Sequence, residues 1–245
     1  DKKDSKHWEK FFSSEIEPLY GPEMTNIIAS LTLSNKKNDI LTVSQLVLLS
    51  KMISFQILRV PGFLEHRFKN GEIMFDETIN ETSQWFQLPP EIIKSKLEDF
   101  VKNKDNFIRN MTIPLIVDKD RLDKLSDVLA EKIWLIYFNN SSVPFITSDS
   151  PVVMHNIIRN SVSYADNGIG RDDTFIYYPI SSKILIRIIP RNFRGRNMNS
   201  LNNTLGFLSN ADISFINSVN NLQISHAENQ IFVHPDFMDY LESVS

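Results

Sequence analysis

The spacing of apolar residues changes about halfway along the chain. Up to residue 131, apolar side chains recur every three or four positions, as on one face of a helix. Beyond it they alternate with polar residues or form short continuous runs, as in strands. A group of helices followed by a group of strands predicts an α+β fold. The helices are expected at 7–20, 23–33, 42–59, 88–103, 104–116 and 119–131.

The helix at 42–59 has the strongest pattern. It is apolar nearly all round, which predicts a central, buried helix. Val60, Pro61 and Gly62 end or kink it, and Gly21-Pro22 predicts a break between the first two helices. The broad apolar face contains Val43, Leu46, Val47, Ser50, Ile53, Ser54 and Ile57.

The strands are expected in the second half. Residues 132–140 are apolar on both faces, which predicts a strand buried on both sides. After an Asn- and Ser-rich turn, 143–148 is expected to return as its hairpin partner, and 174–180 pairs with 183–190 around Ser181-Ser182. A helix at 211–225, a short strand within 229–234 and a short helix at 235–243 complete the chain.

We therefore expect one domain over 1–245. Its mainly helical N-terminal half, about 1–131, packs on an antiparallel β-sheet formed by the C-terminal half, 132–245. The chain has 245 residues, of which 42% are hydrophobic and 23% charged, as in an ordinary globular protein. Because it begins at Asp1 rather than at a methionine, we expect a native N-terminal segment to be missing.

Composition narrows the chemistry. The absence of cysteine excludes disulfides and thiolate chemistry and favours a reducing, cytoplasmic location. No run of 18 apolar residues occurs, so no membrane partner is expected. The histidines show no metal-ligand spacing and no phosphate-binding glycine motif is present, so neither a metal nor a cofactor is predicted. Asp149 alone offers too few oxygens for magnesium unless Asp172 and Asp173 join it.

The net charge of −4 argues against wholesale nucleic-acid binding. One segment is an exception, because no acid occurs between Asp173 and Asp212. Arginines surround Phe193 and Gly195 there and could hold a phosphate or RNA by charge and stacking. The alternative is a solvated loop whose charge balances acids elsewhere. The cations of the segment are Lys183, Arg187, Arg191, Arg194 and Arg196.

Two short motifs concentrate polar side chains within apolar elements. Gln56 and Arg59 share a face of the central helix, and an arginine among apolar residues needs a protein carboxylate or an anionic ligand. The stretch 147–151, Thr-Ser-Asp-Ser-Pro, follows a strand. It forms either a polar turn or a loop that presents Asp149 as a functional acid. It lacks the glycines of a serine-hydrolase nucleophile elbow. His226 is either a helix cap or a base.

Several of these stretches resemble a bacterial family, domain of unknown function 4238. The resemblance rests on 53–63, 144–153, 175–186 and 216–232, of which Thr147-Ser148-Asp149 is the most specific part. Ser150 stands where the family usually has asparagine, and the family's opening His-Tyr-x-Pro stretch is absent. The family name carries no activity. The resemblance implies that the residues to watch are Gln56, Arg59, Thr147, Ser148, Asp149, Asn217, Asn220 and His226.

Two functions remain open, and the sequence leaves the oligomeric state undetermined. In the first, the protein binds or acts on a nucleotide or nucleic-acid phosphate, as a hydrolase or nuclease and as a toxin or phage-defence effector. Arg59 and Asp149 then face each other across a cleft. In the second, they form a buried ion pair and the protein binds a protein partner without catalysis. The nucleotide or nucleic-acid hypothesis assigns catalysis to Asp149, Arg59 and His226. It assigns substrate binding to Gln56, Thr147, Ser148, Arg191 and Arg194.

Overall fold

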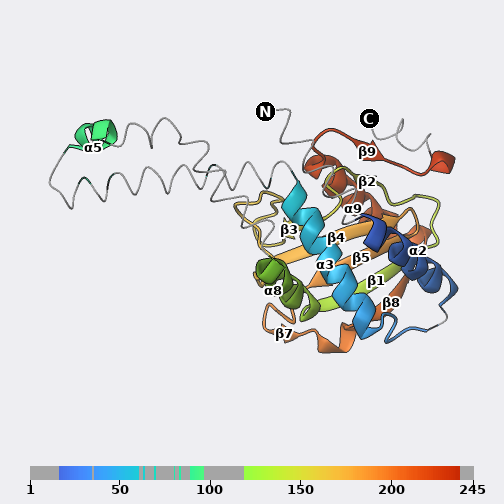
Figure 1. Cartoon of the computed structure of the whole chain (residues 1–245). Helices are drawn as coiled ribbons and strands as arrows, with labels where there is room; N and C mark the ends of the chain where they lie inside the picture. Colours follow the sequence, from blue (N-terminus) through green and yellow to red (C-terminus); the bar gives the residue numbers. More distant parts are fainter. Residues whose placement is uncertain are drawn as a thin grey trace.

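The computed structural model describes residues 17–34, 36–60, 63, 69, 80, 83, 89–96 and 119–237. Helices precede a sheet, so the α+β prediction is confirmed (Figure 1). The helices are α2 (Glu17–Leu33), α3 (Val43–Arg59), α5 (Pro90–Lys96), α8 (Lys119–Ala130) and α9 (Ile213–His226). The main sheet contains β1 (Ile133–Asn139), β3 (Val153–Asn156), β4 (Thr174–Ser181), β5 (Ile184–Ile189) and β8 (Thr204–Leu208).

The sheet has the order β3-β4-β5-β1-β8. Its neighbours run antiparallel except for β1 and β8, which are parallel. The sheet is therefore mixed rather than purely antiparallel as we had expected. A parallel pair joins strands that a tight turn cannot connect, and β8 follows β1 by more than sixty residues, so no local pattern announces it.

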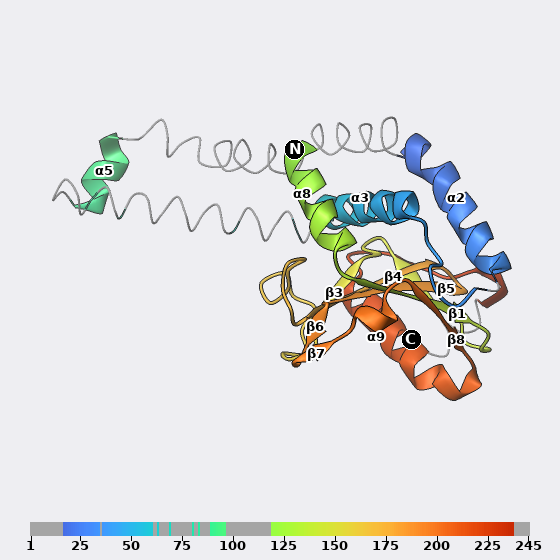
Figure 2. The same ribbon diagram turned by 90° about the horizontal axis from the view of Figure 1, so that it is seen from below.

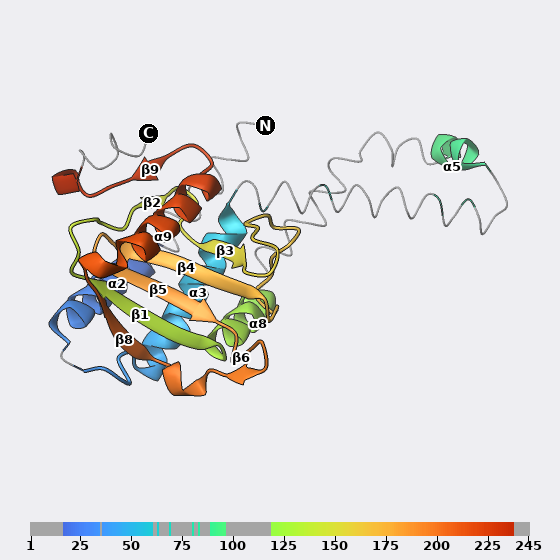
Figure 3. The same cartoon turned by 180° about the vertical axis from the view of Figure 1, so that it is seen from behind.

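Helices cover both faces of the sheet. Figure 2 shows α2, α3 and α8 on one side and α9 on the other. Figure 3 shows α9 crossing the second face close to the short strands β2 (Thr147–Ser148) and β9 (Ile231–Phe232). Ile133, Trp134 and Ile136 of β1 are fully buried, which confirms the prediction of a strand covered on both sides. The Trp134 indole donates to the carbonyl oxygen of Leu129 at 3.0 Å and ties α8 to the sheet.

The central helix forms as predicted and is capped at its start. Thr42 and Gln45 make a reciprocal capping box that satisfies two otherwise orphaned backbone amides. Ile53 and Ile57 are buried against the sheet, but Val43 is 78% exposed. The apolar face is therefore buried only along the later turns of α3, because the first turn is not covered by the described core.

Two local predictions are wrong. α2 continues through Gly21-Pro22 without a break. A proline removes one backbone donor, and burial of Ile27 and Leu31 on the core outweighs that loss. The stretch 143–148 is not the hairpin partner of β1, because β1 pairs with β5 and β8 while the two-residue β2 pairs with β9.

Of the remaining elements, those expected from the sequence agree with the structure where they are described, whereas β3, β8 and the short strands at 192–193 and 196–197 were not predicted. α8, α9 and the start of α5 are confirmed, as are the β4–β5 hairpin and the short strand β9. The predicted helix at 104–116 and residues 7–16 of the first helix lie outside the described residues. At 235–243 the described part is one 3-10 turn, Pro235–Phe237. In the part of the chain described, no helix is long and apolar enough to cross a membrane.

Candidate functional site

The Thr-Ser-Asp stretch is held by amide side chains of α9. Asn220 donates to the carbonyl oxygen of Pro144 at 2.9 Å and accepts from the backbone amide of Ile146 at 3.1 Å. Gln223, one turn on, donates to the Pro151 carbonyl oxygen at 2.8 Å and accepts from the Ser148 hydroxyl at 3.1 Å. These bonds replace part of a strand ladder, which explains why β2 is only two residues long.

Asp149 holds the loop that follows α9. Its carboxylate accepts hydrogen bonds from the backbone amides of Glu228, Asn229 and Gln230 at 3.0, 2.8 and 3.2 Å. The Asp149 amide donates back to the Gln230 carbonyl oxygen at 3.1 Å. Short polar side chains at turns commonly bond nearby backbone in this way. The geometry supports the interpretation of 147–151 as a structural turn.

Gln56 and Arg59 lie in the last two turns of α3. Gln56 is half-buried, and its side-chain oxygen has no hydrogen-bond partner. The side chain of Arg59 lies outside the part that is described. The contact between Arg59 and Asp149, whether across an open cleft or in a buried ion pair, therefore stays a prediction.

His226 ends α9 and contacts a residue that we did not single out from the sequence. Its Nε2 lies 3.1 Å from the hydroxyl of Tyr164, and the two rings are 5.3 Å apart. Burial raises the pKa of Tyr164 to about 12, although the neighbouring Ser150 hydroxyl lowers it in part. Burial also lowers the pKa of His226. At neutral pH both groups are therefore uncharged, and they share one hydrogen bond whose donor is set by the tautomer of the imidazole.

The surroundings of this pair are partly apolar. The ring of Phe63 packs edge-on against Tyr164 at 5.7 Å. The Ser150 and Thr147 hydroxyls are buried without hydrogen-bond partners. An unpartnered buried hydroxyl is uncommon and marks either strain or a functional position. No pattern in the sequence pointed to Tyr164, because it lies in an irregular loop without periodicity.

The basic segment forms a small hairpin rather than an open loop. Its strands are β6 (Asn192–Phe193) and β7 (Arg196–Asn197). Arg194 and Gly195 both have positive φ, 49° and 73°, as a two-residue hairpin turn requires. The Arg194 guanidinium lies 5.4 Å above the Phe193 ring. Arg191 donates to the side-chain oxygen of Asn199 at 3.0 Å, and Arg196 is exposed.

A different arginine of this segment is enclosed by aromatic rings. Arg187 lies in the middle of β5, on the face of the sheet that α9 crosses. Its guanidinium carbon is 4.9 Å from the ring centre of Phe175, 5.4 Å from that of Tyr177 and 5.7 Å from that of Phe215. Burial raises the pKa of Tyr177, and the positive charge of Arg187 and a hydrogen bond from its guanidinium lower it in part. None of the ion pairs among the described residues involves Arg187, and its Nε is buried without a hydrogen-bond partner.

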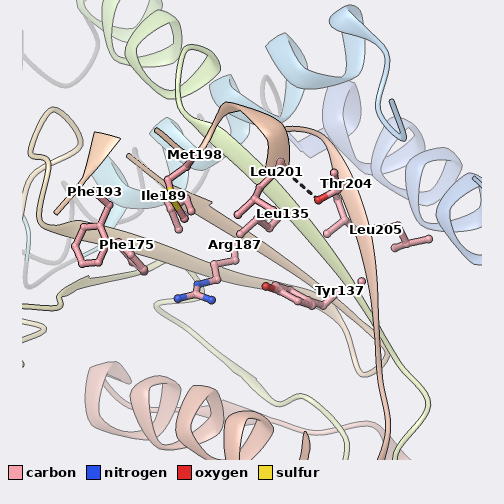
Figure 4. Close-up of a pocket in the computed structure, with 12 residues that line it drawn as sticks. Leu135, Tyr137, Phe175, Arg187, Ile189, Phe193, Met198, Leu201, Thr204 and Leu205 are labelled. Atoms are coloured by element: carbon pink, nitrogen blue, oxygen red, sulfur yellow. Dashed lines mark hydrogen bonds between the residues drawn. The ribbon is translucent and has the colours of Figure 1, made fainter. Parts of the chain in front are cut away.

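Arg187 borders a pocket of about 410 Å³. In Figure 4 its guanidinium points away from the sheet, with Phe175 and Phe193 on one side and Tyr137 on the other. The size and mostly apolar lining, with one charged group, match the usual properties of small-molecule sites. The apolar wall includes Leu135, Ile189, Phe193, Met198, Leu201 and Leu205.

No site for a metal is evident in the described ranges. They contain no group of three or more acids and histidines that could hold a metal ion, so Asp172 and Asp173 do not complete a magnesium site with Asp149 there. Asp173 instead accepts two hydrogen bonds from Arg171, both at 2.8 Å, and one from Asn156 at 3.1 Å. The bonds from Arg171 are the main cause of a lowered Asp173 pKa of about 2.

Comparison with known proteins places this arrangement in a family. A model described as protein of unknown function (DUF4238) matches residues 1–237. The chain belongs to DUF4238. No curated protein and no solved structure matches it.

In this DUF4238 protein, the structure brings some of the sequence-predicted residues together and separates others. Ser148 is hydrogen-bonded to Gln223, Asn220 binds the backbone just before this stretch, and Asp149 binds the loop next to His226. Thr147 and Asn217 are half-buried nearby on β2 and α9. The arginines Arg191 and Arg194 belong to the other region, beside the Arg187 pocket. Sequence reasoning counted Arg187 only as a charge, because its aromatic neighbours come from β4 and α9.

Proposed function

We propose that this DUF4238 protein binds a small anionic ligand in the Arg187 pocket. One observation carries the proposal. A half-buried guanidinium stands on the sheet among aromatic faces, with no carboxylate partner among the described residues, at the edge of a pocket. Withdrawing a charge from water without pairing it is expensive. Cation–π contacts contribute about 0.5–2 kcal/mol and offset only part of that cost. A bound carboxylate or phosphate would supply the missing partner.

The neighbouring hairpin supports an anionic ligand. Phe193 forms part of the pocket wall, and it sits in the same hairpin as Arg194 and Arg196. The sequence from 174 to 211 contains no acid. A concentration of one charge sign around a cavity raises the local concentration of the oppositely charged ligand. This is the way in which Arg191 and Arg194 would contribute to binding.

The proposal is tested by a thermal-shift screen of small phosphates and carboxylates. We expect at least one anion to raise the Tm of the wild type and to leave the Arg187→Gln variant unchanged. Arg196→Gln is the matched control, because it removes an exposed arginine of the same segment, and it should respond as the wild type does. Equal shifts in wild type and Arg187→Gln would contradict the proposal, provided that circular dichroism shows both to be folded.

A hydrolase or nuclease activity remains a second hypothesis, with Asp149, Arg59 and His226 as the catalytic residues. The observation that favours it is the Tyr164–His226 pair beside the buried Ser150 hydroxyl. The test is incubation with RNA, DNA and nucleotides, where His226→Gln should abolish any cleavage without unfolding the protein. Against it, the backbone bonds of Asp149 favour the alternative, a non-catalytic interaction module. An effector role in phage defence stays a prediction.

A further inference from the structure

We infer that the ligand of the Arg187 pocket is a hydrophobic monoanion, a carboxylate attached to an alkyl or aromatic body, rather than a nucleotide. This inference rests on the proposed function, because it concerns the same pocket. It goes further by naming which chemical class the walls of that pocket accept. Four properties of the pocket lead to it: the charge that it offers, the polar groups that it lacks, its apolar wall, and the position of the outer arginines.

The pocket offers a single formal charge. Among the described residues, Arg187 is the only charged one that lines it. One guanidinium neutralises one carboxylate through two parallel hydrogen bonds. A phosphate dianion or a polyphosphate placed at the same point would leave at least one negative charge without a partner in an apolar environment, which is unfavourable. The charge balance therefore favours a monoanion.

The pocket offers few polar groups besides Arg187. The Thr204 hydroxyl already donates to the Leu201 carbonyl oxygen at 2.8 Å. Tyr137 adds its hydroxyl, which lies on the side facing Arg187 in Figure 4, and its ring lies against the backbone of β8 because Gly206 has no side chain. A Cβ at Gly206 would come within 3.0 Å of two Tyr137 ring carbons. No long helix begins among the lining residues, so the backbone cradle that binds nucleotide phosphates is not found there.

The remaining wall is hydrocarbon and aromatic. Phe193 stacks edge-on against Phe175 at 4.8 Å, and Phe175 in turn lies under the Arg187 guanidinium. Met198 and Leu201 close the pocket from the segment that follows the hairpin. Such a wall stabilises an apolar body by removing it from water. The ribose and the polar edge of a base would instead lose hydrogen bonds that no group here replaces.

The outer arginines lie outside this contact. Arg194 is exposed, and its guanidinium rests on Phe193, whose ring forms part of the pocket wall. Neither Arg191 nor Arg194 lines the pocket. They therefore attract anions of every class through water, with an effect that salt screens. Selectivity for the ligand class belongs to the pocket wall and Arg187.

The experiment is isothermal titration calorimetry of the full chain with matched probes. The probes are decanoate, decanol, 4-phenylbutanoate, AMP and inorganic phosphate. We expect decanoate and 4-phenylbutanoate to bind once per chain. Decanoate should bind at least about tenfold more tightly than the neutral decanol, because decanol cannot make the charged hydrogen bond to Arg187. AMP and phosphate should show no binding at the same concentrations. Equal binding of decanoate and decanol would overturn the inference.

Variants separate this inference from the proposed function. In Arg187→Met, decanoate should bind no better than decanol, whereas Arg194→Gln should keep the wild-type ratio of the two affinities and lose only salt dependence. If AMP binds only when Arg187 is present and decanoate does not displace it, the proposed function holds and the carboxylate class is overturned. If no anion binds in an Arg187-dependent way, both are overturned.

A second variant keeps the test valid if Arg187→Met does not fold. Met198→Trp adds bulk to the opposite wall and leaves the guanidinium in place. It should abolish decanoate binding with an unchanged circular dichroism spectrum. Decanoate binding that survives in Met198→Trp with wild-type affinity would place the ligand elsewhere and contradict the inference.

Discussion

Asp149 shows at the scale of a residue how one carboxylate can organise a loop. Three consecutive backbone amides, from Glu228 to Gln230, point at its two oxygens. Those amides lie beyond the C-terminal end of α9, outside its hydrogen-bond ladder, and need an acceptor from elsewhere in the fold. The carboxylate thus connects the Thr-Ser-Asp turn to the segment that leads into β9.

Replacing Asp149 should therefore cost stability. We expect Asp149→Ala to lower the free energy of unfolding by roughly 1–3 kcal/mol, because hydrogen bonds to a charged acceptor are lost. Urea denaturation followed by circular dichroism measures the change. Glu131→Ala, at an exposed position before β1, serves as the control and should change the value by less than about 0.5 kcal/mol. An unchanged midpoint for Asp149→Ala would show that the loop is held by other contacts.

His226 is expected to make stability depend on pH. Burial lowers its pKa in the folded protein, so the folded state binds this proton less readily than the unfolded chain does. The neutral imidazole therefore contributes stability that is fully present above the ordinary histidine pKa, near 6.5. This stability is lost as the pH falls through the lowered pKa of the folded state.

The measurement is Tm between pH 7.5 and pH 5. We expect the wild type to lose more Tm over this range than His226→Gln does. His234→Gln removes an exposed histidine and should retain the wild-type slope. Parallel curves for wild type and His226→Gln would contradict the assignment of a buried, neutral imidazole.

At the scale of elements, α9 contributes hydrogen bonds as well as apolar packing. Ile216 and Val219 are buried against the sheet, and Asn220 and Gln223 are buried beside them. The two amides bind backbone groups of the stretch that leaves the sheet after β1. A helix can thus substitute for a neighbouring strand, since each amide side chain carries both a donor and an acceptor.

Asn220→Ala tests this substitution. It leaves a carbonyl oxygen and an amide of the 144–146 stretch buried without partners, so we expect a loss of roughly 2–4 kcal/mol in the free energy of unfolding. Asn221→Ala is the matched control on the same helix, because Asn221 is exposed. Comparable losses in both variants, measured by urea denaturation, would mean that helix propensity rather than the buried amide determines the effect.

At the scale of the whole molecule, β1 is the centre of the architecture. It pairs with β5 on one side and β8 on the other, and helices cover both faces around it (Figure 2). The two-residue strands β2, β6, β7 and β9 form separate small sheets. Stability is expected to decrease from the central strands outward, because opening β1 requires both layers to separate.

Hydrogen exchange measured by mass spectrometry tests this order. The amides of β1 and β5 should be the last to exchange, and those of the β6–β7 hairpin among the first, with rates differing by at least about a hundredfold. The β4–β5 turn at Ser182-Lys183 provides an internal fast-exchange reference within the same sheet. Protection of the β6–β7 hairpin equal to that of β1 would require a further contact over the basic segment.

Local patterns determined the elements whose signals lie within a few residues. The helix at 42–59, the double-faced apolar run of β1 and the β4–β5 hairpin were all predicted, because neighbouring residues decide helix periodicity, strands and tight turns. The Thr-Ser-Asp motif identified the family in the same way. The sequence by itself thus determined the α+β class, most described elements and one candidate loop.

Only the tertiary structure decided how distant segments meet. The parallel pairing of β1 with β8 and the antiparallel pairing of β2 with β9 join segments too far apart for a local signal. Tyr164 meets His226 across sixty-two positions. In the sequence Arg187 is one of several basic residues. In the structure rings from β4 and α9 surround it, and no carboxylate among the described residues pairs with its charge. Its environment depends on long-range packing, and that environment, rather than its identity, makes it the strongest candidate for binding.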